Sequence, residues 1–478
     1  MQIKSMFLRT LFFALFMMMV GCSDSDTNGT TDTPPPYAGN PAFVTTWQTD
    51  AQGGSSDNEI KISTEGSTGH LFTIDWGDGV IEAELSGDNL HAYDEPGLYT
   101  VKITGDFPRL SFNEWDSDAN KLRTVEHWGD MNWTSMAYAF KGCSYLRINA
   151  DDLPDLSQVT EMQYMFSGTL LFNDDISGWD TANVTDMSHM FDEAYSFDQD
   201  IGSWDVRKVT NMEAMFRKTV HFDQPLSAWK TESLVDVRYM FQDAEAFDQP
   251  LESWMMGHVT SLYGMFMGTT KFNQPLGEWN TSSVTNMAYT FTDATAFNQT
   301  VGEWNTSSVT YMTSMFENVP HFNQPLGQWD TSSVQGMSSM FKGDVSFDQP
   351  LSGWDTQQVR NMQYMFEDAS SFDQDIGHWD TSALQYATSM FKNATSFDQF
   401  LDWDISSALN LQFMMENSGL SRANYDQILV AWGGQSVQNG VYFSAGSTQY
   451  SNISAVISAH DTLTDTYHWN ITDGGMAP

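Results

Sequence analysis

A unit of 25 residues is repeated along most of this sequence without insertion. Its first phenylalanine recurs at every step of 25, and a tryptophan seven residues later keeps the same spacing until the last copy, where it is one residue early at Trp403. A fixed period of this length is typical of stacked repeats, in which each unit buries its apolar face only against its neighbours. We therefore predict a repeat solenoid over residues 159–416. The phenylalanines are Phe172, Phe197, Phe222, Phe247, Phe272, Phe297, Phe322, Phe347, Phe372 and Phe397.

Within each unit, the apolar pattern changes from one half to the other. In the segment 184–194, apolar residues fall at i, i+3, i+4 and i+7, which is the spacing of one helical face. They are Met187, Met190, Phe191 and Ala194, with Thr185 placed as an N-cap. The segment around Leu226 contains proline, which favours a short strand or an extended turn there. The unit thus predicts a leucine-rich-repeat-like α/β coil, with a short extended segment and a short helix.

The composition is strongly acidic. Twenty Lys and Arg residues stand against 62 Asp and Glu, which gives 20 − 62 = −42. Such a charge repels nucleic acid and anionic lipid, so we expect neither as a partner. The hydrophobic content of 41% excludes a disordered chain.

The N-terminus has the pattern of a targeting segment. Lys4 and Arg9 precede the apolar run 11–20, which is too short to span a membrane. The run ends in "MVGC", which resembles a bacterial lipobox and implies cleavage after residue 21 and lipidation of Cys22. Residues 22–40 then form a linker rich in Pro, Ser and Thr. We expect a lipid-anchored protein of the bacterial cell surface, on the outer membrane in a Gram-negative source, with the anchor as its only membrane contact. Cys143 is expected to be a buried core thiol.

Residues 41–105 have the alternating pattern of short strands. The motifs "IDWGDG" and "HAYDEPGLYTVKI" resemble the PKD (polycystic kidney disease) domain, which implies a small all-β, immunoglobulin-like sandwich. Asp75 and Asp78 flank the "WGDG" turn, and we expect them to close it through backbone hydrogen bonds rather than to bind a cation. Residues 106–158 are predicted to form an irregular first repeat, and residues 417–478 a C-terminal cap.

The repeat itself resembles the BspA-type leucine-rich-repeat surface lipoproteins of bacteria and mycoplasmas, whose unit reads like "FNQDISSWDTSNVTDMSYMF". Copies such as "FNQPLGEWNTSSVTNMAYTF" at 272–291 carry this resemblance. It implies a cell-surface protein that adheres to, or binds, other macromolecules.

We use the word column for the residues at one equivalent position in successive units. Two columns of the repeat could bind metal. The Met-x-x-Met pairs have soft sulfur ligands suited to Cu(I), but each second Met precedes Phe on the same apolar stripe, which favours core packing. A column that alternates between Asp and Asn, from Asp198 to Asp398, could hold Ca²⁺. Because both residue types accept backbone N–H bonds, a structural ladder is favoured and no cofactor is expected, with Ca²⁺ left open.

Packing, capping and turn closure account for the repeated columns. Positions that remain free to vary include Glu278, Glu303 and Gln328, each one residue before a column Trp, and these are our candidate binding residues. We therefore predict a non-catalytic, monomeric binding or adhesion scaffold whose partner is an extracellular protein or a polysaccharide. A glycan-capture accessory protein is the alternative, since exposed Trp or Tyr can stack on sugars. A surface hydrolase is less favoured, because no catalytic motif stands out.

Overall fold

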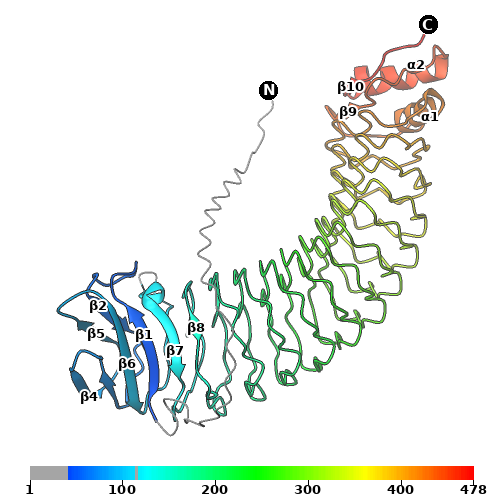
Figure 1. Cartoon of the computed structure of the whole chain (residues 1–478). Helices are drawn as coiled ribbons and strands as arrows, with labels where there is room; N and C mark the ends of the chain where they lie inside the picture. Colours follow the sequence, from blue (N-terminus) through cyan, green and yellow to red (C-terminus); the bar gives the residue numbers. More distant parts are fainter. Residues whose placement is uncertain (1–40, 114–116) are drawn as a thin grey trace, which may run out of the picture. The chain divides into compact units, whose positions relative to one another are not determined.

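The structure is a computed structural model and describes residues 41–113 and 117–478. The predicted signal peptide, Cys22 and the linker lie outside these residues. The described chain has two parts: a mostly β N-terminal region and an array of tandem repeats followed by two helices (Figure 1).

The N-terminal region is built on one six-stranded sheet with strand order β4-β3-β6-β1-β7-β8, and a separate antiparallel pair, β2 and β5. Strand β1 lies inside the sheet because it pairs with both β6 and β7, each antiparallel. The strands are β1 (Phe43–Gln48), β2 (Glu59–Ile62), β3 (Phe72–Asp75), β4 (Ile81–Leu85), β5 (Asn89–Ala92), β6 (Leu98–Gly105), β7 (Leu122–His127) and β8 (Arg147–Ile148). The sheet therefore continues beyond residue 105 into the first repeat.

A buried ion pair fixes the chain just before β7. The short 3₁₀ helix η1 (Ala119–Lys121) places Lys121 next to Asp118, with 3.6 Å between Nζ and Oδ1, and both side chains are fully buried. Lys121 Nζ also donates to the carbonyls of Ser56 and Glu59, at 2.8 and 3.0 Å. Since these acceptors offset the desolvation of the ammonium group, the pair ties the loop before β2 to the start of β7.

The repeats contain consecutive turns where the sequence predicts a helix. The N–H groups of alternate residues donate to carbonyls of the next repeat, for example His189 to Glu213 at 2.7 Å and Phe191 to Met215 at 2.9 Å. The residues between them donate three positions back along their own chain. His189 has a φ of 55°, which is incompatible with a right-handed helix.

The helix prediction for 184–194 is therefore wrong, although the apolar stripe is buried as expected. Met187, Met190, Phe191 and Ala194 all have 0% exposure. Successive turns point the same four positions inward, so the spacing alone did not distinguish turns from a helix. Thr185 is not an N-cap, because its hydroxyl donates to the carbonyl of Thr160 in the preceding repeat at 3.1 Å.

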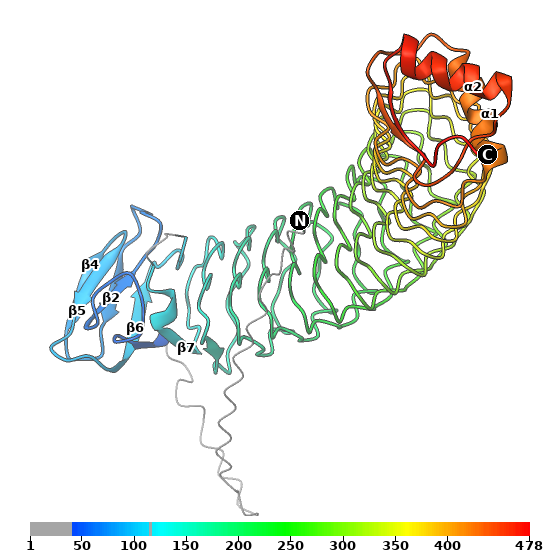
Figure 2. The same ribbon diagram turned by 90° about the horizontal axis from the view of Figure 1, so that it is seen from above.

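Successive repeats are linked through single parallel β-bridges, as between Asp186 and Asn211, and we call the residues at this position the bridge column. The repeats lie side by side in both views (Figures 1 and 2). The described repeats from residue 159 to 416 contain no named strand, and the segment around Leu226 is irregular. The expected leucine-rich-repeat strand is thus reduced to at most one bridge between successive repeats, located in a different part of the unit. The prolines at positions such as 225 fit this geometry, because no sheet ladder requires their missing N–H.

Aromatic columns fill the interior of the array. The phenylalanine column that opens each unit is fully buried, and neighbouring rings such as Phe272 and Phe297 stack with centroids 6.1 Å apart. The tryptophan column is also buried, with Trp279 at 3% exposure. Trp279 Nε1 donates to the carbonyl of Leu251 in the preceding repeat at 2.9 Å, and Trp304 repeats this bond to Leu276. The column indoles from Trp204 to Trp403 therefore fill the core and hydrogen bond to the preceding repeat.

The C-terminal region adds helices α1 (Arg422–Gly433) and α2 (Ser454–Asp461), the π-helical turn η2 (Thr462–Thr466), and the parallel strands β9 (Tyr442–Ser444) and β10 (Asn470–Thr472). Ser421 caps α1 by accepting the N–H of Asn424. Strand β9 continues the bridge column of the array, because Phe443 pairs with Leu411. The last repeat is thereby covered by hydrogen-bonded structure, as an array end requires.

Replacing Trp279 with alanine should destabilise the array by about 3–5 kcal/mol, since the change removes a large buried ring and one of the two N–H donors to the Leu251 carbonyl. Urea denaturation would measure the free energy of unfolding. Glu278→Ala, at the adjacent exposed position, is the control and should change it by less than about 0.5 kcal/mol. Equal effects of the two substitutions would contradict the burial of this column.

Candidate functional site

The Asp/Asn column forms a ladder that links each repeat to the next. Asp223 Oδ1 accepts the N–H of Asp248 at 2.9 Å and the Nε2 of Gln249 at 2.9 Å. Asn273 Oδ1 accepts the N–H of Asn298 in the same way, at 2.9 Å. Asp and Asn alternate freely in this column because one side-chain oxygen performs the task. The predicted structural role of the column is confirmed by these hydrogen bonds.

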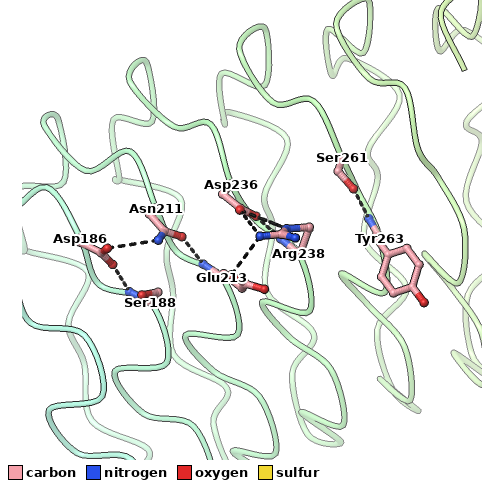
Figure 3. A network of polar contacts seen from close by, with 8 residues as sticks. All are labelled: Asp186, Ser188, Asn211, Glu213, Asp236, Arg238, Ser261 and Tyr263. Atoms are coloured by element: carbon pink, nitrogen blue, oxygen red, sulfur yellow. Dashed lines mark hydrogen bonds and ion pairs between the residues drawn. The ribbon is translucent and has the colours of Figure 1, made fainter. Parts of the chain in front are cut away.

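A second polar row crosses the array at the bridge column (Figure 3). Here Asp186 and Asn211 each accept the N–H two residues ahead, at 2.8 and 3.0 Å. Arg238 folds back onto two carboxylates, with NH2 2.7 Å from Asp236 Oδ2 and 3.0 Å from Glu213 Oε2. The positive charge of Arg238 is therefore paired with carboxylates of the array itself.

Several other basic residues of the array form ion pairs with carboxylates of the preceding repeat. Arg217 binds Asp192 with two hydrogen bonds of 2.7 Å, and Lys218 Nζ lies 2.6 Å from Glu193 Oε1. Burial acts to raise the pKa of Asp192, but the hydrogen bonds from His189 and Arg217 outweigh it and lower the pKa. Because acidic residues far outnumber basic ones, many carboxylates are left to face solvent.

The repeat pattern is interrupted in the unit that contains Met255 and Met256. Most units have Asp or Asn at the first of these positions, as at Asn280, whose Oδ1 accepts the N–H of Ser282. Most units also have Thr at the second position, and Thr281 Oγ1 donates to the carbonyl of Asn305 at 3.0 Å. Neither methionine can form the corresponding bond. In the same pair of units, the bridge column of the described residues is broken between Asp236 and Ser261.

A groove of about 500 Å³ opens at this interruption. We call it the Met255 groove, and its lining includes Glu232, Glu252, Met255, Met256, His258 and Glu278. Met255 is 58% exposed, whereas Met256 points inward and is 1% exposed. Within the described part of the chain, Glu252 and Glu278 have no ion-pair or hydrogen-bond partner. The groove therefore combines an apolar side chain with unpaired negative charge.

The three candidate residues from the sequence fall on one exposed column. Glu278, Glu303 and Gln328 are all exposed, and of these only Glu278 is among the residues that line the Met255 groove. Met255, Glu232 and Glu252 were not predicted from the sequence. For Met255 a signal was present, because Met255 and Met256 depart from columns otherwise occupied mainly by Asp or Asn and by Thr.

In the N-terminal region, Asp75 and Asp78 close the turn as predicted. Asp75 Oδ1 accepts the N–H of Gly77 at 3.1 Å, and Asp78 Oδ1 accepts that of Val80 at 2.9 Å. Asp78 Oδ2 also binds His91 Nε2 at 2.9 Å. Burial acts to raise the pKa of Asp78, but these hydrogen bonds outweigh it and lower the pKa.

One group of residues in the described chain brings three metal-ligating atoms together, namely His127, Asp151 and Asp152. The oxygens of Asp152 are already used, since they accept the N–H groups of Trp128 and Gly129 at 2.9–3.0 Å. His127 Nδ1 lies 3.0 Å from Asp152 Oδ1. Asp152 thus caps the turn after β7.

Asp344 is a buried carboxyl group inside the array. It occupies a column that holds Ala, Thr or Val in other units, and its exposure is 0%. Thr219 in this column donates its hydroxyl to the Phe216 carbonyl at 2.6 Å, whereas Asp344 Oδ2 has no hydrogen-bond partner among the described residues. Burial raises the pKa of Asp344 to about 9.

Asp344→Asn should remove a pH-dependent loss of stability. The pKa of Asp344 is about 9 in the folded chain, against an ordinary value of 3.8. The contribution of Asp344 to stability is therefore greatest below pH 3.8, where Asp344 is protonated in both the folded and the unfolded state, and it is lost as the pH rises toward 9. Between pH 5 and 8 the free energy of unfolding of the natural chain should fall by up to about 4 kcal/mol relative to that of the variant. Thermal unfolding at several pH values across this range measures the difference in stability. Asp402→Asn, a substitution at an exposed position, is the control and should leave the pH dependence of stability as it is in the natural chain. A pH-independent gap between the natural chain and Asp344→Asn would contradict the assignment.

These features define a tandem-repeat protein with a mostly β N-terminal region. The family described as "Mycoplasma protein of unknown function, DUF285" matches residues 134–254, 236–342 and 322–432. Because these segments together cover residues 134–432, more than half of the chain, the protein belongs to this family. No curated protein matches the chain. Within residues 41–113 and 117–478, no helix combines the length and the apolar character needed to cross a membrane.

Proposed function

We propose that this protein is a non-catalytic binding scaffold of the bacterial cell surface, which displays an acidic solenoid to an extracellular protein. The proposal rests on one observation: the repeated positions of each unit are used within the fold, whereas the variable positions face solvent. The Phe, Trp, Met and Asp/Asn columns are used by packing and by bonds between repeats. The exposed positions beside them, such as Glu278, Glu303 and Gln328, differ between units and can present a varied surface.

The resemblance to BspA-type surface lipoproteins and to PKD domains supports this proposal at the level of family analogy. A surface that varies from repeat to repeat suits an extended partner, because contacts can be distributed over several units. The excess of carboxylates favours a partner with a basic or neutral face. A protein partner is preferred to a glycan because the tryptophan column, the best sugar-stacking feature of the sequence, is buried.

Titration of the intact protein against a panel of extracellular proteins and polysaccharides, each at low and high salt, would test this function. We expect binding to a protein with a basic face, and we expect it to weaken as salt rises because the screened charges contribute to affinity. Binding that is independent of salt would oppose the electrostatic part. Turnover of a substrate that one carboxylate substitution abolishes would show an enzyme instead.

Surface attachment is proposed to depend on lipidation of Cys22. Changing Cys22→Ser should move the protein from the membrane fraction to the soluble fraction, because the thiol that carries the lipid is removed. Cell fractionation with immunoblotting measures the distribution, and Cys143→Ser, which alters a buried thiol, is the control. Membrane association that persists in Cys22→Ser would rule out this anchor.

A further inference from the structure

The Met255 groove lies where the repeat loses two of its own stabilising bonds. A residue of the Asp/Asn type at 255 would accept the Gly257 N–H, and Thr at 256 would donate to the Asn280 carbonyl, as equivalent residues do in other units. Met256 is at least buried, but Met255 leaves most of its apolar side chain in water. Exposed apolar side chains of this kind often mark binding surfaces.

Apart from His258, the ionisable side chains that line the Met255 groove are all carboxylates, and Lys230, one unit before Met255 in the same column, is not among the lining residues. Glu232, Glu252 and Glu278 come from three successive units and are all exposed. Glu232 lies within the field of Arg207, but that guanidinium is bound to Asp205 at 2.6 Å. The lining also includes His258, and no Lys or Arg contributes to it. An occupant that complements the groove therefore carries positive charge next to an apolar stem.

We propose that the Met255 groove binds a lysine- or arginine-bearing segment of a partner polypeptide. The aliphatic stem of the basic side chain packs on Met255, while its cationic end lies among Glu252 and Glu278. Long basic side chains have this two-part character, and methionine adapts its shape to such stems. This inference rests on the proposed binding function and assigns a place and a chemistry to it.

Other occupants fit the groove less well. A neutral sugar would use the apolar surface but leave the carboxylates without a partner, and sugar stacking requires an aromatic face, whereas the column tryptophan here, Trp254, is 3% exposed. A divalent ion would use the carboxylates but not the thioether of Met255, which hard cations do not prefer. A basic polypeptide segment uses both features.

The test measures binding of a fluorescein-labelled peptide, GKLGKLGKLG, to the full-length chain in detergent by fluorescence anisotropy. We expect Glu278→Gln to weaken binding about two- to fivefold, the effect of one exposed charge pair. The matched control is Glu303→Gln, which changes the same column one unit later, outside the groove, and should change affinity less than about twofold.

A second variant restores the repeat pattern without changing the net charge. Met255→Asn should permit the missing hydrogen bond to the Gly257 N–H at an exposed position, so it should fold with an unchanged or higher unfolding temperature. It should also weaken peptide binding about tenfold or more, because the apolar contact is lost. Peptide affinity that is unchanged in this variant would overturn the proposal, and so would equal weakening by Glu278→Gln and Glu303→Gln.

The peptide with all lysines acetylated should bind at least about tenfold more weakly, since it keeps the stem but loses the charge. Equal affinity of the two peptides would show that no cation site is present. Displacement of the lysine peptide by a neutral oligosaccharide or by calcium chloride at matched ionic strength would identify a different occupant. If the lysine peptide does not bind while a protein from the panel does, this inference fails and the proposed scaffold function stands.

Discussion

Backbone hydrogen bonds between successive repeats are the interaction on which the remaining structure depends. In each unit, alternate N–H groups of the turn segment reach carbonyls about 24 residues ahead, while the groups between them close turns within the unit. Buried polar groups of the backbone must be paired, and a chain of tight turns cannot pair all of them internally. The neighbouring repeat supplies the missing acceptors, so a single unit could not hold this conformation alone. The constant period keeps each donor aligned with its acceptor, and in the last unit, which is one residue shorter, the Ala387 N–H still reaches the carbonyl of Asn410.

The side-chain columns depend on the same register. From Trp204 to Trp403, the offset between units places a carbonyl of the preceding unit within reach of the Nε1 of each column Trp, as for Trp279 and Leu251. The Asp/Asn ladder uses a side-chain oxygen to bind the backbone of the next unit, as Asp223 does for Asp248. At nearly every column, the burial of apolar side chains and the hydrogen bonding of polar groups therefore favour the same register, as expected of a sequence that specifies one fold.

Departures from the columns are correspondingly informative. Asp344 puts a carboxyl group in a buried column of Ala, Thr and Val, where burial keeps it protonated at neutral pH. Met255 puts an apolar side chain in a polar, exposed column and coincides with a groove lined by carboxylates. The first departure affects stability from within the array, whereas the second changes the surface. Repetition provides an internal reference in both cases, because the other units show what the same backbone position does without the substitution.

The sequence by itself determined the period, the buried columns and the acidic character of the surface. Those properties follow from which residues recur and how often, and they need no knowledge of backbone direction. It did not determine the local conformation of 184–194, because an apolar spacing of i, i+3, i+4 and i+7 buries Met187 and Phe191 equally well on a helix or on consecutive turns. Only the tertiary structure decided between them, since the N–H groups that a helix would use internally are taken by the next repeat. The Met255 groove was likewise beyond the sequence: the departure of Met255 and Met256 from their columns was visible there, but their proximity to Glu232 and Glu278 exists only once three units are stacked.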